Sequence, residues 1–118
     1  MVPRERARPE LNRIPERNIS LRCIRFVAQV DVDRKALEER WGTPEFVSGD
    51  LGEWVCFAFS SAEGESILLQ REVEHPPAPG FLLSVTSGLF STQAVSRIIE
   101  ALGIPDAQVI QVNEEAVS

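Results

Sequence analysis

The chain has 118 residues, of which 43% are hydrophobic and 25% are charged, a balance typical of one globular domain with its own core. The net charge of −6 is unevenly placed: residues 1–25 carry seven arginines and three glutamates, whereas residues 26–118 carry five basic and fifteen acidic residues. An acidic body argues against a nucleic-acid partner, because phosphates require a basic surface. No apolar run approaches the roughly 18 residues that cross a membrane, so we expect no membrane partner.

Residues 1–19 are predicted to form an N-terminal arm rich in proline and arginine. Such a segment has too few apolar residues to fold alone. It also lacks the apolar stretch of a secretion signal, so we expect a cytoplasmic protein in which Cys23 and Cys56 pack as small apolar residues. Residues 20–118 are then expected to form a single domain.

The first predicted elements after the arm are a strand over residues 20–32 and a short helix over residues 34–41. Alternating apolar residues indicate the strand, in which Phe26 is expected to share a face with every second residue up to Val32. Asp33 is a typical N-cap, and Gly42 is a typical helix end.

The middle of the chain is predicted to be a run of strands over residues 45–48, 53–60, 65–73 and 81–86. The second of these is the strongest, because both of its faces are apolar. A hairpin with Gly64 at its turn joins the second strand to the third, and three prolines stiffen the loop that begins at His75.

A second helix is predicted to begin after the N-cap Ser91 and to run to Leu102, followed by a strand over residues 108–112. The end of this second helix repeats the pattern at the end of the first, since Gly103 is followed after one residue by proline. The order β-α-β-β-β-β-α-β predicts an α+β fold, with a single mostly antiparallel sheet and both helices packed on one face. In outline this order resembles the ferredoxin-like arrangement.

No catalytic, metal or cofactor site is predicted. Cys56 with His75 is a conceivable nucleophile and base, but Cys56 belongs to a strand that is apolar on both faces, whereas reactive thiolates prefer electropositive, exposed surroundings. Glu72, Glu74 and His75 have too few ligand types for zinc and are expected to be solvated charges. No glycine-rich phosphate-binding motif is present.

The predicted sheet has a second face that the helices leave uncovered, and simple alternation assigns its residues. The apolar ones are Cys23, Val27, Trp54, Cys56, Ala58, Leu68 and Leu82, with Arg25, Gln70, Glu72 and Ser84 among them. An apolar patch with polar residues around it is typical of an interface or a ligand groove. The candidate binding residues are Trp54, Leu68, Val27, Glu72 and His75, with Trp54 as the anchor because tryptophan dominates interface energetics.

Three occupants of this face are considered: a second copy of the chain, the arm of residues 1–19, or a foreign partner or small apolar ligand. We expect a small acidic protein-binding domain without catalytic activity, of the inhibitor or immunity type, or a homo-oligomeric assembly module. The alternative is a small-molecule-binding or enzymatic α+β domain that uses the same face.

Overall fold

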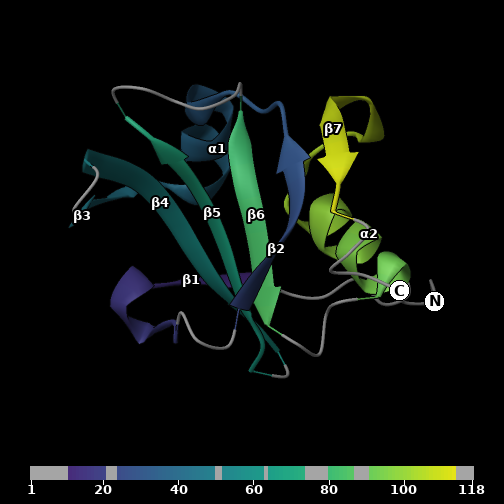
Figure 1. Cartoon of the computed structure of the whole chain (residues 1–118), viewed down its shortest axis with the longest axis horizontal. Coiled ribbons are helices and arrows are strands. Elements are labelled where there is room, and N and C mark those ends of the chain that lie inside the picture. The colour runs from purple at the N-terminus through teal and green to yellow at the C-terminus, as the bar shows by residue number, and fades with distance from the viewer. Residues whose placement is uncertain are drawn as a thin grey trace, which may run out of the picture.

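The computed structural model describes residues 11–20, 24–49, 52–62, 64–73, 80–86 and 91–113 (Figure 1). The strands are β1 (Leu11–Ile14), β2 (Ile24–Val30), β3 (Glu45–Gly49), β4 (Gly52–Ser61), β5 (Ser66–Glu72), β6 (Phe81–Thr86) and β7 (Val109–Val112). The helices are α1 (Arg34–Trp41) and α2 (Thr92–Ala101), with the short 3-10 helices η1 (Glu16–Asn18) and η3 (Asp106–Gln108). One mostly antiparallel sheet with two α-helices confirms the predicted α+β fold.

The seven strands form one sheet in the order β1-β4-β5-β6-β2-β7, and β3 also pairs with β4. Figure 1 shows this sequence of strands from β3 on the left to β7 on the right. β1 pairs with residues 58–61 of β4 and β3 with residues 52–56, so both lie along the same side of β4. β5 pairs with the other side, which places the apolar strand β4 in the interior of the sheet.

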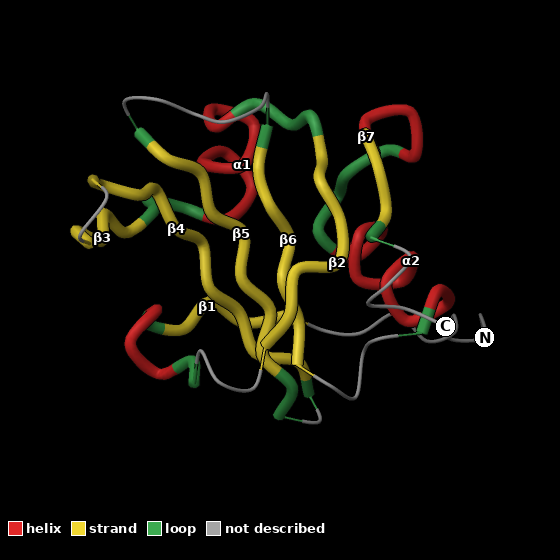
Figure 2. Tube along the Cα trace, viewed as in Figure 1, coloured by secondary structure: helices red, strands yellow, loops and turns green. Residues whose placement is uncertain are grey.

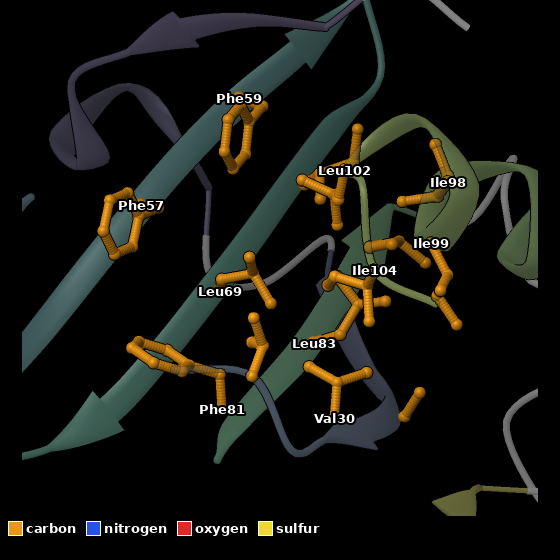
Figure 3. Packing of buried hydrophobic residues seen from close by; sticks show 14 of the residues in the cluster. Val30, Phe57, Phe59, Leu69, Phe81, Leu83, Ile98, Ile99, Leu102 and Ile104 are labelled. Carbon is orange, nitrogen blue, oxygen red and sulfur yellow. The ribbon is translucent and has the colours of Figure 1, made fainter. Parts of the chain in front are cut away.

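Both helices pack against one face of the sheet, which we call the helix-covered face. Their buried residues, among them Leu37 of α1 and Ile98 of α2, join one cluster with side chains from β2, β4, β5 and β6. Phe57, Phe59, Phe81, Leu69 and Leu83 are all 0% exposed within it (Figure 3). Burial of this apolar surface is the main source of folding free energy, at about 25 cal/mol per Å².

The two helix ends predicted from the repeated glycines are present, and they meet each other. Gly42 and Gly103 have φ values of 92° and 84°, the left-handed conformation that glycine adopts without strain. Trp41 Nε1 donates a hydrogen bond of 3.1 Å to the carbonyl oxygen of Leu102, so the ends of α1 and α2 are joined directly. Ser91 caps α2 by accepting from the backbone N–H of Ala94 at 3.1 Å. The Asp33 side chain, although at the N-cap position of α1, makes no capping hydrogen bond.

Strand β2 departs from the alternation that the sequence predicted. Phe26 pairs with Ser84 and Ala28 with Leu83, so a bulge at Val27 shifts the register. Val27 is 0% exposed and belongs to the helix-covered cluster, whereas Phe26 lies opposite Ser84 on the other face. The prediction that Val27 lies on the uncovered face is therefore wrong, because a one-residue bulge exchanges the faces of the residues before it.

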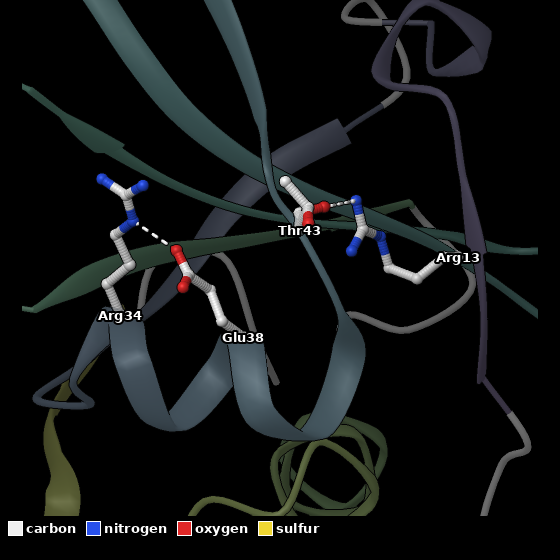
Figure 4. A network of polar contacts seen from close by, with 4 residues as sticks. All are labelled: Arg13, Arg34, Glu38 and Thr43. Atoms are coloured by element: carbon white, nitrogen blue, oxygen red, sulfur yellow. Dashed lines mark hydrogen bonds and ion pairs between the residues drawn. The ribbon is translucent and has the colours of Figure 1, made fainter.

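Part of the predicted N-terminal arm belongs to the sheet. Residues 11–14 form β1, a strand that the sequence did not predict, and η1 follows at the lower left of Figure 2. Arg13 of β1 donates hydrogen bonds to the carbonyl oxygens of Trp41 at 2.9 Å and Thr43 at 3.1 Å, the second of which is drawn in Figure 4. Its guanidinium also lies over the rings of Phe57 and Phe59, so this arginine fixes β1 to the end of α1.

Candidate functional site

The face opposite the helices is the candidate site, and we call it the open face. The strand register assigns to it Ile14, Phe26, Glu45, Val47, Trp54, Cys56, Ala58, Leu68, Gln70, Glu72, Leu82 and Ser84. These side chains form rows across the sheet, because residues directly opposite on neighbouring strands point the same way. One row is Val47, Trp54 and Glu72, and the next begins Glu45, Cys56, Gln70 and Leu82.

One part of the open face is already covered by the chain itself. Ile19, directly after η1, is 6% exposed and packs with Cys56, Ala58 and Leu68 in a small apolar cluster. The structure therefore buries Leu68, at 1% exposure, beneath the chain's own N-terminal segment. The arm, one of the three occupants considered for this face, therefore covers the part near Leu68.

The other part of the open face, around Trp54, stays accessible. Trp54 packs at the margin of the small cluster and is half-buried, as are its row neighbours Val47 and Glu72. Glu72 lies directly opposite Trp54 on β5, a pairing that places their Cβ atoms about 5 Å apart. Gly52, two residues before Trp54 on the same face, carries no side chain, and a β-carbon there would meet Glu72 Oε2 at 3.6 Å. A half-buried indole, a carboxylate and backbone without a side chain therefore lie side by side.

Three carboxylates, those of Glu16, Glu45 and Glu72, lie on or beside this face. Glu45 accepts the backbone N–H of Glu16 through both carboxylate oxygens, at 2.9 and 3.1 Å. Burial above all, and then the negative charges of Glu16 and Glu45, raise the pKa of Cys56 from 9.0 to about 12. Glu72 adds a third carboxylate in the neighbouring row.

Cys56 is not poised for nucleophilic chemistry. It is 2% exposed, and a thiol with a pKa of about 12 stays protonated at neutral pH, whereas the thiolate is the reactive form. Its surroundings are apolar or acidic, which is the opposite of an activating site. This supports the packing role that the sequence suggested. Its conceivable partner His75 lies outside the described residues, as does Cys23.

The sequence and the structure agree on only part of the predicted site. Trp54 and Glu72 lie together on the accessible part of the open face, Leu68 is buried two rows away on the same face, and Val27 lies in the core instead. Sequence reasoning missed Glu45 and Val47, which β3 adds to the face. The alternation of residues 45–48 could have assigned both to one face, but which strand they join depends on long-range pairing.

Several hollows lie on the helical side of the molecule. One of about 380 Å³ is lined by Ser96, Arg97, Glu100, Ile104, Pro105 and Asp106. A neighbouring hollow of about 280 Å³ between α2 and β7 is lined by Thr92, Val95, Ser96, Ile99, Asp106, Val109 and Val112. Neither hollow contains a residue of the open face, so a small molecule held there would not use the predicted site.

Two properties of the described residues bear on other functions. No group of three or more histidine, cysteine or acidic side chains is placed to hold a metal ion within those residues. No helix in that part of the chain has the length and apolar character needed to cross a membrane.

Comparisons with known proteins give no lead to a function. No family model matches the chain, and neither the curated proteins nor the solved structures include a match. The function must therefore be argued from the surface itself.

Proposed function

We propose that this chain is a small cytoplasmic protein-binding domain without catalytic activity, which holds a basic partner protein against the accessible part of its open face. One observation carries the proposal. Both helices pack on the same face of the sheet, and the opposite face presents a half-buried tryptophan, Trp54, beside carboxylates. Tryptophan at the centre of a patch is a common anchor of protein interfaces, and complementary charge increases the rate of encounter.

The acidity of the face favours a foreign partner over a second copy packed face to face. A symmetric face-to-face dimer would bring the patch with Glu72 and Glu45 of one copy against the same acidic patch of the other, since a twofold interface uses one patch twice. Carboxylates placed opposite one another repel and lose hydration. A partner with lysine or arginine at its surface would instead neutralise them. An inhibitor that blocks a basic protein fits this description.

A matched pair of charge reversals tests the proposal. Glu72→Lys changes the open face, whereas Glu100→Lys makes the same change in net charge at an exposed position of α2. Each variant and the wild-type chain are immobilised and exposed to host lysate at low salt. We expect a basic protein to be retained by the wild type and by Glu100→Lys, and lost from Glu72→Lys.

The salt dependence provides a second readout of the same experiment. Because the Debye length falls from about 10 Å at 0.1 M salt to about 3 Å at 1 M, the retained protein should elute as salt rises. Retention of the same proteins by all three chains would contradict the proposal, as would retention that does not respond to salt.

A further inference from the structure

Trp54, Glu72 and Gly52 together form a site, which we call the seat, with the chemistry to bind one particular side chain. We propose that it binds an arginine of the partner, with the guanidinium stacked on the Trp54 indole and paired with the Glu72 carboxylate. This inference rests on the proposed function and names the group that the partner must supply.

This site offers both interactions that a guanidinium makes. A planar cation stacks on an aromatic face, and its N–H groups match the two oxygens of a carboxylate. The register puts Trp54 and Glu72 directly opposite each other, and Gly52 leaves the space beside the Glu72 oxygen free of any side chain. Lysine has a compact ammonium that cannot stack in this way, so it should bind more weakly.

Two other aromatic rings of this chain already have an arginine over them. The guanidinium of Arg34 lies 5.1 Å from the centre of the exposed Phe46 ring, and its Nε pairs with Glu38 at 2.7 Å (Figure 4). Arg40 lies 5.1 Å from the Trp41 ring. Trp54 and Glu72 reproduce the ring and carboxylate of the first case, but within the described residues neither has a cation, hydrogen bond or ring partner.

The charge around the seat also favours a cation. Glu45 lies in the row next to that of Trp54, and its carboxylate accepts a hydrogen bond from the backbone N–H of Glu16. The negative potential of these groups attracts a cation before contact and repels an acidic side chain, whereas a neutral side chain gains nothing from it. The occupant is therefore expected to be an arginine within a basic segment.

The test uses three blocked glycine-rich peptides that differ only in carrying two arginines, two lysines or two neutral citrullines. Each is titrated into the full chain, and the indole N–H resonances of both tryptophans are followed by NMR. Trp54 reports on the seat, whereas Trp41, whose indole N–H is bonded to Leu102, serves as an internal control for folding. We expect Trp54 alone to shift, with the arginine peptide binding about fivefold more tightly than the lysine peptide and the citrulline peptide showing no binding.

The variant Glu72→Gln keeps the shape of the side chain and removes its charge. It should weaken the arginine peptide about fivefold, the size expected for one partly exposed ion pair. Equal binding of the arginine and lysine peptides at Trp54 would overturn the arginine seat while leaving a basic partner on the open face intact. Binding of no peptide at Trp54 would also overturn the seat, and the charge-reversal pair would then decide the proposed function separately.

A final variant separates a foreign partner from the chain's own N-terminus, which carries Arg4, Arg6 and Arg8. Replacing these three with glutamine should leave the Trp54 resonance of the free chain unchanged. A shift in the absence of peptide would overturn the inference, since the occupant would then be an arginine of this chain.

Discussion

Removing the side chain of Arg13 should destabilise the protein by about 2–3 kcal/mol. Arg13 belongs to β1, the strand that brings the N-terminal segment into the sheet, and its guanidinium bonds to the carbonyl oxygens of Trp41 and Thr43. It also lies 5.2 Å and 5.9 Å from the ring centres of Phe57 and Phe59. Arg13→Ala therefore removes two hydrogen bonds from a charged donor and two cation–π contacts together.

The magnitude follows from opposing contributions. A hydrogen bond to a charged group contributes about 1.5–3 kcal/mol and a cation–π contact about 0.5–2 kcal/mol. Against this, the Nε of Arg13 is buried with no hydrogen-bond partner among the described residues, and burying part of a charge is unfavourable. The loss of stability in Arg13→Ala is therefore expected to be smaller than the sum of these contributions.

Urea unfolding of the wild type, Arg13→Ala and Asn12→Ala measures this directly. Asn12 is the exposed neighbour of Arg13 on β1, so its replacement should stay within about 0.5 kcal/mol of the wild type. Arg13→Lys keeps the positive charge but not the planar set of guanidinium N–H donors, so it should recover only part of the stability that Arg13→Ala loses. An Arg13→Ala variant as stable as Asn12→Ala would refute the role of Arg13 in fixing β1 to α1.

Two further predictions concern the interior. The pKa of the Cys56 thiol rises from its ordinary value of 9.0 to about 12 in the folded protein, so the fold stabilises the protonated form. As pH rises through this window, the free energy of unfolding should fall by about 1.4 kcal/mol per pH unit. Unfolding measured from about pH 8 to about pH 10.5 should show a shallower fall for Cys56→Ala than for the wild type, and parallel curves would contradict the assignment. Gly80→Ala should lower the free energy of unfolding by more than about 4 kcal/mol, because its β-carbon would collide with the carbonyl oxygen of Val30. Gly64→Ala should lower it by only about 1 kcal/mol, because Gly64 also has a positive φ, of 87°, but open space around it. Thermal melts of this pair check the comparison, and similar losses would show that φ alone governs both positions.

The helix ends were predictable because they depend on local chemistry. Gly42 and Gly103 each occupy a position that requires a positive φ, and the residue that follows after one spacer is proline in both cases. The Ser91 cap was predictable for the same reason, since its hydroxyl bonds to a backbone N–H only three residues away. What the sequence did not reveal is that the two ends bind each other through Trp41, because that contact joins residues 61 positions apart.

The open face was only partly predictable because it depends on register. Trp54 and Glu72 lie in strands with unbroken alternation, and their facing positions follow from the hairpin between β4 and β5. Val27 was misplaced because the bulge in β2 leaves no clear mark in a run of apolar residues. β1 was missed because four residues among prolines and charges pair only through β4, far along the chain.

The most direct test of the central claim is a photocrosslink from the open face in the living host. A benzophenone amino acid replaces Val47, the neighbour of Trp54 on β3, in one version of the chain and Ile110, which is 44% exposed on β7, in another, so that Trp54 itself is kept. The account predicts an adduct with a different, basic protein from position 47 alone. An adduct of two copies of this chain, an adduct from both positions, or no adduct from position 47 would contradict it.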